Sequence, residues 1–348
     1  MSIVSQRPKL DNPKKFMKWD DKKKLNQKIA NRLIVAGFLK RGFRMKECSQ
    51  KIQITECTKC GKYEITNAKL CRDRLCPVCS WRLSIKRFAE MSKVCEEILK
   101  AYPHNEWSFL TLTVKNCEPS LLGGTLGHMA EAFNRMRQRK VFKDNIIGWA
   151  RAIETTFNLE DNPVTVHPHF HVLIIWNMGV DRQTEGARLK NAWEYACKDL
   201  VVSYKGQHIE DIEANLAEED GRDITGAVLE TFKYTQKSSD LLSVPIGVFI
   251  DYAVSVENKR MIAFGGIIKQ YMQKLHFSMN DEPDEPQTIT VCRNCGSEEL
   301  SQAIYKWSFA ERSYLFAPLQ RSIDMGDPEE VDPEEGVPEA FGNSVKDD

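Results

Sequence analysis

The sequence of 348 residues has no long hydrophobic run, which excludes the usual signals for membrane insertion and export. No stretch approaches the roughly 18 uninterrupted apolar residues of a spanning helix, and the first residues, MSIVSQRPKLDNPKKF, contain no apolar core of signal-peptide length. Both absences predict a cytoplasmic protein that does not contact a membrane. The composition is otherwise that of an ordinary globular chain, with 42% hydrophobic and 28% charged residues, and no internal repeat is found.

The chain also lacks net charge, with 49 basic and 49 acidic residues, and this balance alone disfavours a nucleic-acid partner. The charges are unevenly distributed, however. Residues 7–46 include fourteen basic and three acidic residues, whereas residues 324–348 include ten acidic residues and one lysine. The basic part predicts a local surface that binds polyanions, and the acidic tail is predicted to be disordered because few apolar residues are available to pack it.

Shifts in composition divide the chain into five parts. We predict a basic N-terminal segment (1–47), a cysteine-rich module with its following helix (48–100), a strand-rich body (105–275), a C-terminal region with a CxxC pair (276–323) and the acidic tail (324–348). A linker is expected at 281–287. Apolar runs are short at 48–82, so we expect that core burial alone cannot hold this module together.

The spacing of apolar residues predicts the secondary structure. Helices are expected at 20–40, 80–102, 126–139, 182–199 and 226–237, and strands at 107–115, 149–157, 167–176 and 201–204. In the first helix Leu25, Ile29, Leu33 and Val35 are spaced for one buried face, with the lysines in solvent. The turn-forming residues NLEDNP separate the second and third strands, so these two strands are predicted to form an antiparallel hairpin.

Two CxxC pairs lie close together in the cysteine-rich module. In a cytoplasmic chain, eleven cysteines favour metal binding over disulfides. The first pair is Cys57 and Cys60, the second is Cys76 and Cys79, and fifteen residues separate them. This spacing predicts one structural zinc site with four thiolates, and the alternative is a set of buried free thiols.

Four other cysteines leave the ligand set of the zinc site open. Cys48 and Cys71 lie nearby in the sequence, and either could replace a member of the four or join a second site. Cys292 and Cys295 form a further CxxC pair, which is half a site. This pair could complete a zinc site with Cys48 or Cys71, bind metal across a dimer, or hold no metal.

Three of the seven histidines, His167, His169 and His171, alternate within the third predicted strand. A strand directs alternate residues to one face, so the three imidazoles should converge while the apolar residues between them fix the strand in the core. The predicted hairpin brings Glu154 opposite the histidines as a further ligand. Mixed histidine and carboxylate ligation suits Mg²⁺ or Mn²⁺ acting on a phosphate, and the alternative is three surface or core histidines.

The segment at 230–237 carries a second candidate for chemistry. On a helix, positions four apart share a face, so Glu230 and Tyr234 could both point at one substrate. A tyrosine hydroxyl has an ordinary pKa of about 10 and is a weak nucleophile unless its developing charge is stabilised, which Lys233 or Lys237 could do. Taken alone the segment is weak evidence, because the chain has nine tyrosines.

Together these motifs resemble the rolling-circle replication initiators of small bacterial plasmids, members of the HUH endonuclease superfamily. The resemblance runs from about Cys57 to Lys274. It rests on CPVC at 76–79, FLTLTVKN at 109–116, RAIETT at 151–156, HPHFHVLI at 167–174 and the EXXXY segment at 230–234. The resemblance implies an α+β fold, in which helices flank a central antiparallel sheet of ferredoxin or RRM type, with the zinc module N-terminal to it.

The resemblance also implies roles for individual residues. His169 and His171 match the metal-binding pair, Glu154 is a less specific match for the third ligand, and His167 is a possible addition. Tyr234 matches the nucleophile that becomes joined to the 5′ end of the nicked strand. Glu230 matches the carboxylate that serves the terminating cleavage in place of a second tyrosine.

The resemblance makes DNA the expected partner, together with a host helicase and polymerase. The basic residues that we expect to contact DNA are Arg72, Arg74, Arg82, Lys86, Arg87, Lys233 and Lys237. One alternative is a rolling-circle transposase, which shares the histidine strand but characteristically has two tyrosines where this chain has Glu230 and Tyr234. The other is a zinc-binding regulator of DNA without enzymatic activity.

Overall fold

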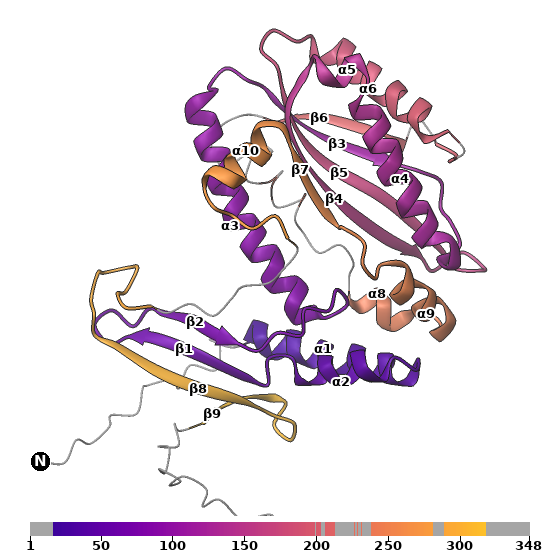
Figure 1. Cartoon of the computed structure of the whole chain (residues 1–348). Helices are drawn as coiled ribbons and strands as arrows, with labels where there is room; N and C mark the ends of the chain where they lie inside the picture. The colour runs from indigo at the N-terminus through magenta and orange to yellow at the C-terminus, as the bar shows by residue number, and fades with distance from the viewer. Residues whose placement is uncertain are drawn as a thin grey trace, which may run out of the picture.

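The computed structural model describes residues 17–198, 200–202, 206–212, 226, 228, 231, 238–280 and 289–317. Within these residues the fold is α+β, with two antiparallel sheets and several helices, as Figure 1 shows. One sheet has the strand order β6-β3-β5-β4-β7, and the other has the order β2-β1-β8-β9. The predicted linker at 281–287 and the predicted disordered tail lie outside the described residues.

The five-stranded sheet contains the predicted histidine strand near its centre. Its strands are β3 (Trp107–Thr113), β4 (Ile146–Asn158), β5 (Thr165–Trp176), β6 (His208–Ile212) and β7 (Ile262–Gly265). The predicted hairpin is present, because β4 pairs antiparallel with β5 along nearly its whole length. The strand predicted at 201–204 is not found at Val201 and Val202, and the edge strand begins instead at His208.

Helices cover both faces of the five-stranded sheet (Figure 1). On one face lie α4 (Leu122–Arg137) and α6 (Arg182–Cys197), and toward the other lie α10 (Gly266–Lys274) and α3 (Pro77–Ala101). The buried face of α4 follows from its sequence, because Leu126, Met129, Phe133 and Met136 recur every three or four residues. Shorter helices are η2 (Pro119–Leu121), α5 (Lys140–Lys143), α8 (Ser238–Ser243) and α9 (Ile246–Ser255).

The four-stranded sheet joins two parts of the chain that were predicted to be separate. Its strands are β1 (Lys51–Cys57), β2 (Tyr63–Ala68), β8 (Leu300–Ser308) and β9 (Ser313–Ala317). Every residue of β1 has a partner on β8. The C-terminal hairpin therefore completes the sheet that begins in the cysteine-rich module.

The basic N-terminal segment forms two helices where one was predicted, α1 (Met17–Val35) and α2 (Leu39–Glu47). Gly37 adopts a φ of 86° and ends α1, with its N–H bonded to Ile34 and that of Phe38 bonded to Leu33. Val35, predicted to be buried, is 78% exposed, because it occupies the last turn before this break. Lys23, predicted to lie in solvent, is fully buried.

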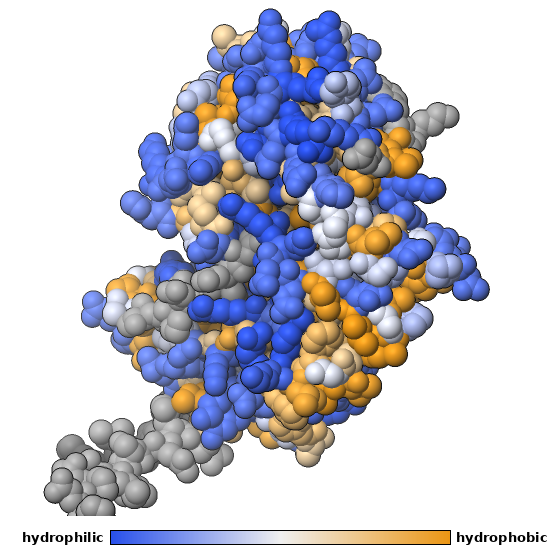
Figure 2. Space-filling view, turned by 45° about the vertical axis from the view of Figure 1, so that its right-hand side comes forward, coloured by the Kyte–Doolittle hydropathy of each residue, from blue (hydrophilic) through white to orange (hydrophobic). Residues whose placement is uncertain are grey.

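One face of the molecule is mostly polar. Figure 2 shows hydrophilic residues over most of one face, with apolar residues gathered toward its lower right. Within the described parts of the chain, no helix combines the length and the apolar character needed to cross a membrane.

Candidate metal centres

The structure brings Glu154, His169 and His171 together on one face of the five-stranded sheet. Glu154 lies opposite His169 in the β4–β5 pairing, and His171 is two residues further along the same strand face. Glu154 Oε2 is 2.7 Å from His171 Nε2 and 3.4 Å from His169 Nε2. One ligand atom from each residue lies within 4.8 Å of the others, close enough for all three to contact one ion.

Neighbouring side chains orient His171. Strand β3 pairs with β5 so that Thr111 lies opposite His171, and the Thr111 hydroxyl is 3.5 Å from His171 Nδ1. The ring of Phe109 stacks on His171 with 5.1 Å between centroids. Phe109, Thr111 and Thr113 alternate along the FLTLT run, which indicates that they share one face of the strand. The sequence does not indicate that this face also carries the histidines.

His167, the possible additional ligand, lies outside the three-residue cluster. Its Nδ1 is 2.8 Å from the side-chain oxygen of Asn116, which fixes its ring. Burial and then the neighbouring His169 hold the pKa of His167 below its usual range. Within the residues described, His169 Nδ1 is buried and has no hydrogen-bond partner.

Two imidazoles and a carboxylate form a donor set that suits a divalent cation. These residues fit Mg²⁺ or Mn²⁺ when water or phosphate oxygens complete the coordination. All three side chains are about one-tenth exposed, so a substrate phosphate could still reach an ion between them. The geometry can therefore support metal-assisted chemistry on a phosphate.

The predicted nucleophile segment is only partly described. Glu230, Lys233, Tyr234 and Lys237 lie outside the described residues. Within the helix predicted at 226–237, Val228 and Thr231 are helical and buried, in agreement with that prediction.

Two tyrosines outside the predicted nucleophile segment differ in their exposure. Tyr252 is buried, and burial raises the pKa of its hydroxyl to about 12. Its hydroxyl is 3.0 Å from that of Thr155, which points to the opposite face of β4 from Glu154. Tyr195 is 71% exposed, and the guanidinium of Arg139 lies over its ring.

Eight of the eleven cysteines form two clusters of four, which corrects the predicted grouping. Cys76 and Cys79 join Cys48 and Cys71, whereas Cys57 and Cys60 join the distant pair Cys292 and Cys295. The first group lies at the open end of the β1–β2 hairpin and the second at its turn. Strand β1 has seven residues, and a strand of that length spans roughly 20 Å, so the two predicted CxxC pairs cannot share one ion.

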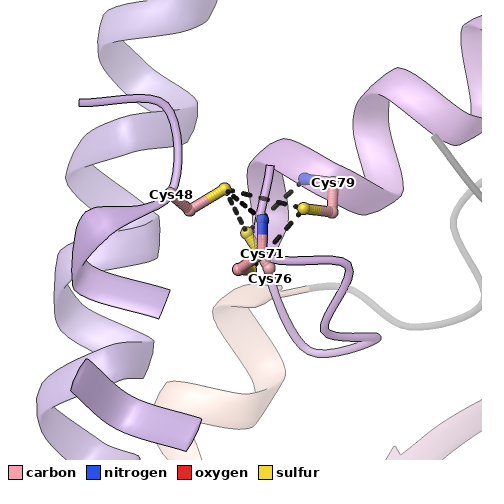
Figure 3. Close-up of side chains that lie close together, drawn as sticks. All are labelled: Cys48, Cys71, Cys76 and Cys79. Carbon is pink, nitrogen blue, oxygen red and sulfur yellow. Dashed lines mark hydrogen bonds between the residues drawn. The ribbon is translucent and has the colours of Figure 1, made fainter. Parts of the chain in front are cut away.

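The first group, called here the buried cluster, has all four cysteines inside the protein (Cys48, Cys71, Cys76 and Cys79). Figure 3 shows the four side chains converging, with one of them on α3. The sulfur of Cys48 lies 3.6 Å from those of Cys76 and Cys79. Four thiolates at about 2.3 Å from one ion would be separated by roughly 3.8 Å, so the cluster has the dimensions of a tetrahedral site.

Helix α1 contributes two polar side chains to the buried cluster. The side-chain amide of Asn26 donates a hydrogen bond to Cys76 Sγ at 3.2 Å. The ammonium of Lys23 donates to the carbonyls of Lys46 and Cys48. Its buried positive charge lies where four thiolates would concentrate negative charge. No pattern in the sequence indicates this role, because Lys23 stands in a run of three lysines.

The structure removes one residue from the predicted DNA-binding set. Arg87 is fully buried, where it pairs with Glu90 at 2.7 Å and donates to the carbonyls of Ser278 and Asn280. Its position on the inner side of α3 makes it part of the packing between α3 and the chain that follows α10. Arg82 and Lys86 lie on the same helix and are partly exposed.

Two further basic residues of that set flank a buried acid. Arg72 is exposed and Arg74 is partly exposed, on either side of Asp73 in the loop that carries Cys71 and Cys76. Asp73 accepts hydrogen bonds from the guanidinium of Arg41 at 2.9 and 3.2 Å, which fixes this loop against α2.

An antiparallel sheet with a His-His-Glu cluster, joined to two four-cysteine clusters, defines a class of α+β protein with candidate metal sites. Comparison with known proteins gives the family. The family model described as "Replication protein" matches residues 62–315. The chain therefore belongs to the replication protein family.

Individual relatives agree with this assignment. "Protein rep" of Streptococcus pneumoniae serotype 2 (strain D39 / NCTC 7466) is 29% identical over 306 residues, which cover 85% of this chain and 91% of that protein. "Protein rep" of Bacillus amyloliquefaciens is 31% identical over 254 residues, covering 68% of this chain and 74% of the relative. "Replication protein" of Staphylococcus aureus is 30% identical, covering 66% of this chain and 99% of its own length. No solved structure gives a significant match.

Proposed function

We propose that this protein initiates rolling-circle replication of a plasmid by nicking one DNA strand at the origin. The observation that carries the proposal is the convergence of Glu154, His169 and His171 on adjacent strands of an antiparallel sheet, in a chain of the replication protein family. The strand order, with the histidine strand β5 in the middle, supports a sheet of the ferredoxin or RRM type that HUH endonucleases use.

His169, His171 and Glu154 would hold Mg²⁺ or Mn²⁺. When bound, the ion supplies Lewis-acid polarisation of the scissile phosphate and neutralises charge that develops there. Thr111 and Phe109 hold the His171 ring in one orientation, so that its Nε2 faces Glu154. The orientation of these ligands before substrate arrives lowers the cost of assembling the site.

Tyr234 is the proposed nucleophile. Its hydroxyl loses its proton to solvent, its phenolic oxygen attacks the phosphorus, the bond from phosphorus to the 3′ oxygen breaks, and the departing oxygen takes up a proton from solvent. The products are a 5′-phosphotyrosine and a free 3′-hydroxyl, which a host polymerase extends while a host helicase opens the duplex. Lys233 or Lys237 would stabilise the phenolate. Because the phosphoester bond is conserved in the adduct, later rejoining needs no ATP.

Glu230 would serve the terminating cleavage, either by activating water or by positioning the second attacking group. This assignment separates the proposed initiator from a transposase, in which a tyrosine would stand at position 230.

The cysteine-rich module would recognise the origin. We assign a structural Zn²⁺ to the buried cluster, since four closely spaced thiolates in a closed site are typical of zinc. The ion would fix the loop that carries Arg72 and Arg74 and the start of α3, from which Arg82 and Lys86 could contact DNA phosphates.

A gel assay tests the proposal. Oligonucleotides tiled across the single-stranded origin of the replicon that encodes the chain, labelled on the 5′ or 3′ side, would be incubated with the protein and Mn²⁺. We expect a denaturation-resistant adduct that carries only the label 3′ to the nick, and its reversible loss on chelation. A DNA-binding regulator would shift the oligonucleotide without an adduct. Undiminished cleavage in EDTA after exhaustive dialysis would show that the metal role is wrong.

A further inference from the structure

The second group of cysteines, called here the hairpin cluster (Cys57, Cys60, Cys292 and Cys295), brings together sulfurs from two ends of the chain. Cys57 Sγ is 3.6 Å from Cys295 Sγ, and Cys60 Sγ is 3.6 Å from Cys292 Sγ. These distances are far longer than the S–S bond of a disulfide, which is about 2.05 Å. They are close to the roughly 3.8 Å edge of a zinc tetrathiolate tetrahedron.

The two halves of the hairpin cluster have the same local structure. Each is a CxxC pair followed directly by a glycine with positive φ, Gly61 at 69° and Gly296 at 70°. In each half, the glycine N–H bonds to the carbonyl of the first cysteine, with distances of 2.9 Å and 2.8 Å. The turn therefore reverses the chain tightly after the second cysteine, at a position where a glycine avoids steric strain.

Backbone amides also approach the sulfurs in equivalent positions. The N–H of Lys62, two residues after Cys60, hydrogen bonds to the Cys60 sulfur. The N–H of Ser297, two residues after Cys295, hydrogen bonds to the Cys295 sulfur. Amide donors that point at sulfur stabilise a thiolate ligand, and isolated free thiols would give no reason for the same arrangement to occur twice.

Strand pairing places the two halves opposite each other. Cys57 is the last residue of β1 and pairs with Leu300, the first residue of β8. The N–H of Thr58 also bonds to the carbonyl of Glu299 at 3.0 Å. The two CxxC turns thus extend from the same end of two adjacent antiparallel strands, and their sulfurs face a common point.

We infer that the hairpin cluster binds a second zinc ion, separate from that of the buried cluster, and that this ion pins the C-terminal β8–β9 hairpin to β1. The ion would link residues more than 230 positions apart in the chain, with the whole five-stranded sheet between them. Long-range cross-links of this kind restrict the unfolded chain strongly. The inference does not depend on the nicking reaction.

The two zinc ions should differ in how easily they are removed. All four cysteines of the buried cluster are inside the protein, whereas Cys60 and Cys295 are exposed. A chelator can reach the exposed sulfurs without opening the fold. We expect a chromophoric chelator to remove one zinc rapidly and the second only slowly.

The test measures bound metals on the full chain. The experiment uses the His169→Ala and His171→Ala background, so that the histidine site contributes no zinc and a failure of the nuclease proposal leaves the result unaffected. Elemental analysis should find two zinc ions and no iron per chain. Cys295→Ser should hold one zinc and lose the rapid phase of chelation. The matched control Cys117→Ser, which changes a cysteine outside both clusters, should retain two.

Other outcomes would overturn the inference. These are one zinc ion in the parent chain, iron in place of zinc, or two zinc ions retained by Cys295→Ser. If Cys295→Ser fails to fold, Cys295→His provides the second variant, because histidine remains a zinc ligand. It should restore two zinc ions, and a folded Cys295→His protein with one zinc would also contradict the inference.

Discussion

The two sheets are stabilised in different ways, and the difference separates chemistry from architecture. The five-stranded sheet is packed on both faces, and Trp107, Phe170 and Trp193 are fully buried. Its candidate metal site, Glu154, His169 and His171, lies on one face of this packed sheet. The four-stranded sheet has a cysteine cluster at each end of the β1–β2 hairpin. An ion on the first sheet would serve the reaction, and ions on the second would hold the fold together.

Removal of both histidine ligands should affect only the reaction. For the His169→Ala and His171→Ala double variant we expect nicking of supercoiled origin plasmid to fall by more than about a thousandfold, because the loss of a single electrostatic stabiliser already costs about 10²–10³. Plasmid nicking and thermal melting are the two measurements, and the melting temperature should change little. His167→Ala is the matched control, since His167 bonds to Asn116, and should lose less than about tenfold. Equal losses in both variants would contradict the three-residue site.

Loss of a cysteine from the buried cluster should show the opposite pattern. Cys76→Ser should release one zinc per chain and loosen residues 48–82, because small zinc modules depend on their ion for folding. Origin binding should then approach non-specific binding, about a thousandfold weaker. Cleavage of a short single-stranded oligonucleotide should survive. If oligonucleotide and plasmid cleavage fall equally, the module is part of the catalytic fold.

Substitutions at two neighbouring residues of α3 should distinguish a role in packing from a role in DNA contact. Arg87→Met leaves Glu90 buried without its partner, which should lower the free energy of unfolding by about 3–5 kcal/mol. Lys86→Met should change the free energy of unfolding by less than about 0.5 kcal/mol. It should instead lower the slope of DNA affinity against salt by about one, as expected for a phosphate contact. Chemical denaturation and salt-dependent binding distinguish the two, and a stable Arg87→Met protein with weakened DNA binding would restore Arg87 to the DNA surface.

The smallest expected effect concerns the hydrogen bond from α1 to the buried cluster. Asn26→Ala removes the donor to Cys76 Sγ and should weaken zinc binding by about 10–100-fold, the usual cost of losing a partner of a metal ligand. Competition with a chelator measures this. Lys28→Ala, on the exposed side of the same helix, should leave zinc affinity unchanged. Equal affinities in the two variants would show that Asn26 does not support the cluster.

The sequence predicted well those features that depend on local pattern. The β4–β5 hairpin follows from alternation on both sides of a turn, and its register was enough to place Glu154 opposite the histidines. Helix α3 was predicted to within a few residues for the same reason. Neither feature depends on contacts between distant parts of the chain.

Features that depend on distant contacts could not be predicted. The choice of Cys292 as a partner for Cys60 is decided by the pairing of β1 with β8, whose hydrogen bonds join residues about 250 positions apart. The burial of Lys23 and Arg87 depends on carbonyls supplied by other segments, and a basic residue on a helix carries no sign of such partners. Spacing alone therefore grouped Cys57 and Cys60 with Cys76 and Cys79, whereas the fold places the two pairs in different clusters.

The proposed mechanism depends most on a covalent bond between one tyrosine and the nicked strand. The direct measurement is mass spectrometry of the adduct formed with an origin oligonucleotide and Mn²⁺, after digestion of the DNA and the protein. We predict a nucleotide attached to the peptide that contains Tyr234, and no adduct with Tyr234→Phe or with the His169→Ala and His171→Ala variant. A nucleotide attached to Tyr195 or Tyr271, or strand cleavage without any adduct, would contradict the proposed mechanism.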